Sequence, residues 1–201
     1  PKVENVYYNF KELVDAMNAD KNGTFKIGAD LNATNVPTPK KWYVDGDFRG
    51  TLKSVDGKHY TIHNTERPLF RNIIGGTVTK VNLGNVNINM PWADRIAPIA
   101  DTIKGGAKIE DVKVTGNVLG RNWVSGFIDK IDNQGTLRNV AFIGNVTAVG
   151  DGGQYLTGIV GENWKGLVEK AYVDANLVGD KAKAAGIAYS SQNGGDNGAV
   201  S

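Results

Sequence analysis

Residues 109–118 read IEDVKVTGNV, and this stretch decides the fold. Apolar side chains at Ile109, Val112 and Val114 alternate with polar ones, and a period of two indicates a β-strand with one buried face. The pattern closes with the triplet Gly-Asn-Val and occurs four times. The four closing triplets are Gly84-Asn85-Val86, Gly116-Asn117-Val118, Gly144-Asn145-Val146 and Ala175-Asn176-Leu177, whose first residues are 32, 28 and 31 positions apart. A repeat of this length predicts a stacked architecture.

A second apolar strip alternates with the first along the chain. Its members are Pro98-Ile99-Ala100, Gly126-Phe127-Ile128, Gly158-Ile159-Val160 and Gly186-Ile187-Ala188, at intervals of 28, 32 and 28 residues. A coil of about 30 residues cannot bury its own apolar side, but coils stacked about 4.8 Å apart pair every strand in parallel. We therefore expect an all-β fold, a right-handed parallel β-helix or solenoid. Alternating helix-and-sheet folds need longer helical connections than these Gly- and Asn-rich intervals provide.

One segment has helical spacing. Phe10, Leu13, Val14 and Met17 share one face after the capping residue Asn9, so we expect an α-helix over 10–19 that caps the N-terminal end of the stack. We expect a single domain over 1–201, with the cap helix and the strand leading into the coils in 1–47 and the stacked coils in 48–201. The chain starts without Met and stops after a glycine-rich segment, so we also expect it to be a fragment of a larger chain.

Composition excludes several classes of function. The 23 basic and 21 acidic residues nearly cancel to a net charge of +2, so nucleic acid is not an expected partner. Cysteine is absent, which removes disulfides, thiolate metal sites and thiol catalysis. No apolar run approaches the roughly 18 residues of a membrane span, so we expect no membrane span in this chain.

No catalytic, metal or cofactor site is predicted. His59 and His63 are four residues apart, but Tyr60 stands where a zinc peptidase needs Glu, and on a strand the two rings would lie about 13 Å apart. Alignment of the first strands places Asn82, Lys113, Ala141 and Tyr172 at one outward position, a column without an acid for carbohydrate catalysis.

Other polar residues are interpreted as structural. Asp129 and Asp132 flank Lys130 at a strand end, where we expect solvated charges. The repeated asparagines Asn85, Asn117, Asn145 and Asn176 are expected to satisfy turn backbone groups rather than to bind calcium, which prefers carboxylates.

A candidate partner surface remains on the second strip. Since Ile99, Phe127, Ile159 and Ile187 already supply an inward face, the following residues are expected to face outward as an apolar column. That column is Ala100, Ile128, Val160 and Ala188, and Trp123 and Trp164 lie near its ends as contact anchors or as structural aromatics.

Several stretches resemble a known family. Residues 48–78 resemble the opening of bacterial GLUG-repeat β-helices, and Gly158-Ile159-Val160-Gly161 carries the repeat signature. Residues 4–10, 139–145 and 161–167 look like the non-catalytic region of streptococcal immunoglobulin A protease-type zinc metalloproteinases.

This resemblance implies a module upstream of a separate metallopeptidase domain, in a large secreted protein attached to the cell wall. It implies no catalysis by this chain, and zinc held in the parent outside these residues. The implied partners are a host protein, the immunoglobulin A heavy chain, and other domains of the parent. An adhesin-like module that binds host protein or glycan is the alternative.

Overall fold

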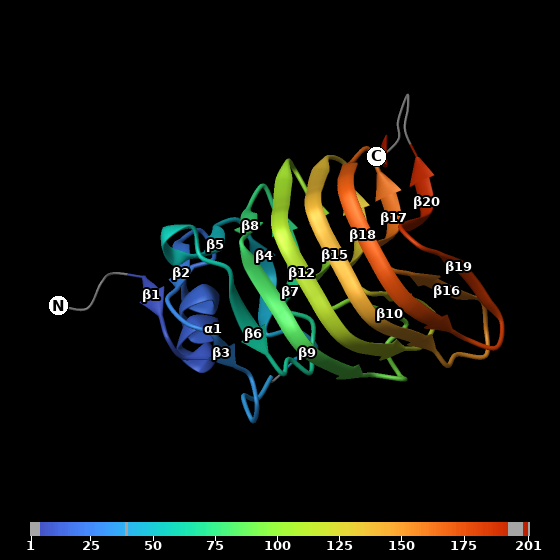
Figure 1. The fold of residues 1–201 in the computed structure, drawn as a ribbon, viewed down its shortest axis with the longest axis horizontal. Coiled ribbons are helices and arrows are strands. Elements are labelled where there is room, and N and C mark those ends of the chain that lie inside the picture. The colour runs from blue at the N-terminus through green and yellow to red at the C-terminus, as the bar shows by residue number, and fades with distance from the viewer. Residues whose placement is uncertain (1–4, 39, 193–198, 201) are drawn as a thin grey trace.

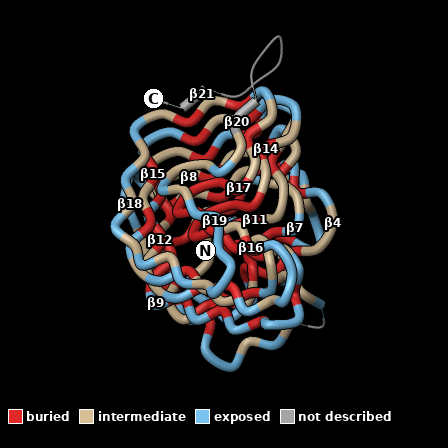
Figure 2. The backbone as a smooth tube through the Cα atoms, turned by 90° about the vertical axis from the view of Figure 1, so that its right-hand side faces the viewer, coloured by how far each residue is buried: buried red, intermediate tan, exposed pale blue. Residues whose placement is uncertain are grey.

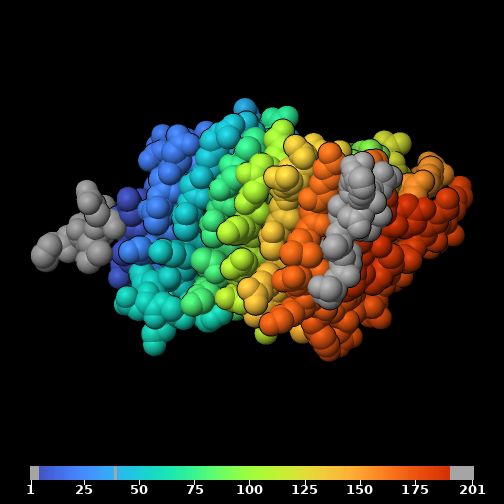
Figure 3. Space-filling model, turned by 90° about the horizontal axis from the view of Figure 1, so that it is seen from above, coloured from blue at the N-terminus to red at the C-terminus, as the bar shows by residue number. Residues whose placement is uncertain are grey.

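The computed structural model describes residues 5–38, 40–192 and 199–200. These residues form a parallel β-solenoid of about six turns with one short helix near the N-terminus, as the sequence predicts. Figure 1 shows the strands following one another along a common axis, and Figure 3 shows the coils as successive bands from the N-terminus to the C-terminus.

Three sheets make up the walls of the solenoid. The first, called here the long sheet, has eleven strands: β1 (Val6–Tyr7), β2 (Thr24–Ile27), β3 (Leu31–Asn32), β5 (Thr51–Ser54), β6 (Tyr60–His63), β8 (Thr77–Thr79), β9 (Val81–Asn89), β12 (Ala107–Gly120), β15 (Gly135–Ala148), β18 (Leu167–Val178) and β21 (Ala199–Val200). The six-stranded sheet contains β4 (Val44–Phe48), β7 (Phe70–Ile74), β11 (Ala100–Lys104), β14 (Ile128–Asp132), β17 (Val160–Trp164) and β20 (Ala188–Gln192). The four-stranded sheet contains β10 (Arg95–Ile96), β13 (Trp123–Ser125), β16 (Gln154–Thr157) and β19 (Ala182–Ala185). A short 3-10 helix, η1 (Val55–Gly57), follows β5.

The predicted capping helix forms as α1 (Phe10–Ala19). The Asn9 side chain accepts a hydrogen bond from the Glu12 backbone N–H at 3.0 Å, which satisfies one of the free donors of the first turn. Phe10, Leu13 and Met17 are buried against the core, and the Phe10 ring meets Tyr43 edge-on. Within the described part of the chain, no helix is long and apolar enough to cross a bilayer.

The repeated strands align as the sequence predicts. Ile109 pairs with Leu137, Val112 with Val140 and Val114 with Phe142, and all of these side chains are buried in one continuous core. Figure 2 shows buried positions along the inside of the coils and exposed positions along the outside. Each coil therefore buries its apolar side only because its neighbours cover it.

The predicted outward apolar column is wrong. Ala100, Ile128 and Val160 are each 0% exposed, and Ala188 is half-buried and packs against the core. The reason is a two-residue bend between the four-stranded and six-stranded sheets, represented by Gly126-Phe127 between β13 and β14. The bend interrupts the alternation, so Phe127 and Ile128 both point inward.

The repeated asparagines stack into side-chain ladders. Asn176 donates to Asn145 at 2.9 Å and Asn145 to Asn117 at 2.6 Å, through side-chain amides on the exposed face. Asn85 is outside this ladder because the register shifts there, and it donates to Asn64 instead. The asparagines are structural as expected, but they pair with each other rather than with turn backbone.

Candidate functional site

Trp123 lies on the outer face of the four-stranded sheet in a row of stacked side chains. Its neighbours in register are Arg95 on β10 and Tyr155 on β16, followed by Lys183 on β19. The Arg95 guanidinium lies 4.3 Å from the Trp123 ring centroid, the Tyr155 ring is stacked at 4.1 Å, and Lys183 Nζ lies 5.7 Å from the Tyr155 ring. This cation–aromatic ladder ties four coils together from the outside.

Tyr189 on β20 closes the outer corner between the two smaller sheets. Its ring meets Tyr155 at 4.8 Å and Trp123 at 5.7 Å, both in T-shaped contacts. A Cβ on Gly161 would lie 3.3 Å from the Trp123 ring, so the missing side chain makes room for this cluster. Both faces of Trp123 are occupied by neighbours, and the ring offers a partner its edge rather than a stacking platform.

An acidic group lies beneath the aromatic cluster. Asp129 on β14 is 4% exposed, and its Oδ2 accepts from Arg95 Nε at 2.7 Å, while Arg95 Nη2 donates to Glu162 at 2.6 Å. Asp129 Oδ1 has no hydrogen-bond partner among the described residues. Burial raises the pKa of Asp129 to about 6, which outweighs the opposing effect of Arg95.

A second carboxylate continues this row. Asp101 on β11 is the neighbour of Asp129 across the β11–β14 pair, and burial raises its pKa as well. Lys41 approaches Asp101 at 3.7 Å and donates to the Arg95 carbonyl at 2.6 Å, so the segment before β4 reaches across to this corner. We call Arg95, Asp101, Trp123, Asp129, Tyr155, Glu162 and Tyr189 the outer corner.

The structure changes the interpretation of two predicted positions. Asp129 is enclosed and ion-paired, so the expectation of a solvated charge there was wrong, since the concave corner removes water from an outward position. Trp164 is half-buried at the end of β17, away from Trp123, and its indole N–H is enclosed with no partner among the described residues. Sequence reasoning missed Arg95 and Tyr189, because their contacts depend on the corner between the sheets.

A groove runs along the outer face of the long sheet. The strands bend at residues with positive φ, Lys80, Asp111, Asn139 and Lys170, which follow one another from strand to strand. Three adjoining cavities of about 580, 400 and 360 Å³ lie along this bend and share Asp111. The predicted column of Asn82, Lys113, Ala141 and Tyr172 lines the smallest of them, and Tyr172 is 59% exposed.

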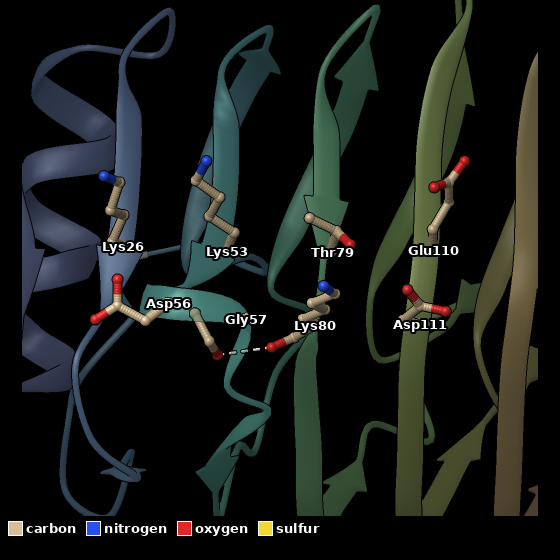
Figure 4. A pocket seen from close by; sticks show the side chains of 9 residues that line it. Lys26, Lys53, Asp56, Gly57, Thr79, Lys80, Glu110 and Asp111 are labelled. Carbon is tan, nitrogen blue, oxygen red and sulfur yellow. Dashed lines mark hydrogen bonds between the residues drawn. The ribbon is translucent and has the colours of Figure 1, made fainter.

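The cavity of about 580 Å³ lies at the N-terminal end of the groove (Figure 4). Lys26 on β2 and Lys53 on β5 lie side by side on one wall, and Glu110 and Asp111 on β12 form the opposite side. The lining also includes Ser54, Asp56, Gly57, Thr79 and Lys80. The sequence did not predict this wall of lysines, because the first coils lack the closing triplet by which the later coils can be aligned.

The two histidines do not form a zinc site. His63 ends β6 and its Nε2 lies 3.8 Å from Asp30, while exposed His59 precedes the strand and lines the groove. The described residues contain no group of three His, Cys, Asp or Glu side chains placed to hold a metal ion.

The sequence matches the family model described as the M26 IgA1-specific metallo-endopeptidase N-terminal region over residues 1–116. The chain belongs to this M26 N-terminal family. The resemblance seen in the sequence is therefore confirmed at the level of the family.

Individual relatives agree with the family assignment. A protein named zinc metalloprotease ZmpB from Streptococcus pneumoniae serotype 4 is 42% identical over 186 residues, which cover 92% of this chain and 10% of that protein. This M26 family chain thus spans about a tenth of the length of that curated relative.

Solved structures show the same fold. A structure named IgA1 Protease aligns with a TM-score of 0.61 and 25% identity, covering 94% of this chain and 18% of that one. A Bacteroides ovatus crystal structure, provisionally described as an immunoglobulin A1 protease, aligns with a TM-score of 0.68 over 89% of this chain and 63% of that one. At 16% identity, the second similarity concerns the fold alone.

Proposed function

We propose that this chain is a non-catalytic β-solenoid module of a secreted, cell-wall-attached zinc metalloendopeptidase of the immunoglobulin A protease type. In this role it presents or helps to engage a host protein substrate, the immunoglobulin A heavy chain, beside a catalytic domain elsewhere in the parent. The observation that carries the proposal is the match to the N-terminal region of the family, together with a relative named as a zinc metalloprotease and about ten times as long.

The physical properties of the fold support this role. A stack of parallel coils with a continuous core is stiff along its axis, so it can hold a bound protein at a fixed distance from another domain. Zinc chemistry would lie outside these residues, because the part of the chain that the structure describes places neither a second histidine nor a cluster of acids around His59 or His63.

The proposal is tested in the parent protease with and without residues 1–201. If the module engages the substrate, its deletion raises KM for intact immunoglobulin A1 about tenfold and leaves kcat for a short peptide substrate unchanged, since only the large substrate reaches the module. Equal losses on both substrates, or no loss on either, would contradict substrate engagement.

The contact surface is tested with single substitutions at exposed positions. Tyr189→Ser alters the outer corner and Tyr172→Ser alters the groove, where these rings are 36% and 59% exposed. Core residues such as Ile128 cannot serve here, since their replacement would unfold the chain.

The adhesin-like alternative has an observation of its own. Trp92 and Tyr172 are 61% and 59% exposed, and neither makes a ring contact with another described aromatic residue. Their ring faces are therefore available to a glycan or a protein, unlike those of Trp123. Binding of the isolated chain to host cells that lack immunoglobulin A, lost in Trp92→Ala or Tyr172→Ala, would favour this alternative.

A further inference from the structure

One row of outward side chains crosses the long sheet with an uneven distribution of charge. In register it reads Lys26, Lys53, Thr79, Glu110, Arg138 and Glu169. The last three alternate in sign, and Arg138 Nε lies 3.8 Å from Glu169. The first two are like charges on neighbouring strands, an arrangement that destabilises a sheet.

The lysines at this end form no ion pair with any acid among the described residues. Among the described residues, the ammonium groups of Lys26, Lys53 and Lys80 form no ion pair or side-chain hydrogen bond, and all three line the cavity of about 580 Å³. Three cations around one cavity favour an anionic group inside it.

The opposite side of the cavity has the complementary character. Glu110 and Asp111 offer carboxylate oxygens there, Thr79 offers a hydroxyl between the two sides, and Asp56 lies below Lys26 and Lys53 (Figure 4); all of these groups accept hydrogen bonds. Three basic and three acidic residues leave the lining without net charge, so a ligand with many negative charges would be repelled at the acidic side. The lining carries no large apolar side chain to hold an apolar ligand.

The backbone of the basic wall is held in place. The Ser54 hydroxyl, 4% exposed, donates to the Lys80 carbonyl at 2.6 Å and accepts from the Tyr60 N–H at 3.0 Å. The first of these bonds is the dashed line in Figure 4. It fixes the bend after β8 against β5, so Lys53 and Lys80 start from a rigid frame and less entropy is lost on binding.

We propose that this cavity binds a monoanionic sugar, with its carboxylate at Lys26, Lys53 and Lys80 and its hydroxyl groups at Thr79, Glu110 and Asp111. One carboxylate and several hydroxyls match the cationic and hydrogen-bond-accepting sides, and a volume of about 580 Å³ suits one or two sugar rings. The site goes beyond the proposed substrate engagement and does not depend on it.

A peptide fits the cavity less well than a sugar. Recognition of an extended peptide commonly uses free strand edges, but the strands that form this wall, β2, β5, β8 and β12, are paired on both sides. Side chains alone remain for recognition, and the accepting groups suit hydroxyl donors.

The test uses the 201-residue chain and two soluble probes, 3′-sialyllactose and methyl glucuronide, with lactose as the neutral control. Titration followed by NMR is expected to show saturable binding of at least one acidic probe and none of lactose. Lys26→Met/Lys53→Met should weaken this binding about tenfold or more, because two charge-assisted contacts are lost while the aliphatic stems stay.

Lys108→Met is the matched control, since Lys108 is exposed on β12, two residues from Glu110, and does not line the cavity. Its binding should equal that of the unchanged chain. The proposal is overturned if neither acidic probe binds at millimolar concentration, if the double substitution leaves binding unchanged, or if an acidic peptide binds in place of both sugars. None of these results bears on the KM of the parent protease, which tests the proposed function separately.

Discussion

Asp129 shows how a solenoid can enclose a charge on its outer surface. The groups that face it come from several coils: Arg95 from β10, Asp101 from β11 and Glu162 from β17, with Lys41 beyond Asp101. Arg95 favours the ionised carboxylate, whereas burial and the two other acids oppose ionisation, and the pKa rises to about 6. A proton is therefore retained on Asp129 in the folded chain at pH values where the unfolded chain has lost it.

This retained proton predicts a specific pH dependence. Between about pH 4 and pH 6 the folded chain binds one more proton at Asp129 than the unfolded chain, so this group makes the free energy of unfolding fall as pH rises through that window. Across this window, Asp129 lowers the free energy of unfolding by about 2 to 3 kcal/mol. In Asp129→Asn this contribution should be absent, and urea denaturation from pH 4 to pH 7 should show the difference between the two chains changing by that amount. Parallel stability curves would contradict the assignment.

Single residues also show what the sequence could not predict. The inward direction of Ile99, Phe127 and Ile159 follows from the repeat, but the direction of the next residue depends on the bend angle at the corner. Alternation continued through a bend gives the wrong face, as it did for Ile128. The same corner encloses Asp129, which the sequence pattern placed in solvent. The acidic part of the outer corner therefore could not be predicted from the sequence.

At the scale of elements, glycines of neighbouring long strands lie side by side in register. Gly116 and Gly144 are in register, with φ of +136° and +150°, and a Cβ on Gly144 would lie 1.8 Å from the Gly116 carbonyl oxygen. No side-chain rotation relieves a clash with backbone. The closing triplet of the repeat therefore marks a close approach between strands, and it lies within the long strands rather than at their ends.

Gly144→Ala is predicted to destabilise the chain by about 3 kcal/mol or more, because β15 must move away from β12 and adopt a strained φ. Gly106→Ala is the matched control, since Gly106 also has positive φ, +83°, but a Cβ there meets nothing within 4 Å. It should cost only about 1 kcal/mol, the conformational part alone. Chemical denaturation measures both, and equal losses would mean that the close approach of backbones is not the cause.

Elements were predicted well where the periodicity was local. The helix over 10–19 forms at the expected residues because its capping residue and its apolar face both lie in one continuous segment of the sequence. The strand expected to lead into the coils within 1–47 instead divides into β2 and β3, and the early coils have no triplet to fix their register. The lysine wall of the groove lies in these early coils, so its alignment could not be derived from spacing.

At the scale of the whole molecule, the two ends of the stack differ. At the N-terminal end, α1 covers the core, and Leu13 and Met17 are 0% exposed. On β18 the inward residues Val173, Ala175 and Leu177 are only partly buried, whereas Phe142 and Val146, their counterparts on β15, are 0% exposed. In the isolated 201-residue chain, β18 pairs with β21 only at Leu167 and Val168 among the described residues, so β18 gains less from burial than the central strands.

This difference predicts a gradient of local stability along the axis. Amide hydrogen exchange should be slowest in β12 and β15, which pair along most of their length on both sides, and markedly faster in β18 and β19. The β2 and β5 strands behind α1 should be better protected than β18, because the helix covers their end of the core. Mass-spectrometric exchange of the intact chain measures all of these segments together. Uniform protection from β2 to β18 would show that the stack opens as one cooperative unit, and that the partial burial of β18 in the 201-residue chain has no energetic consequence.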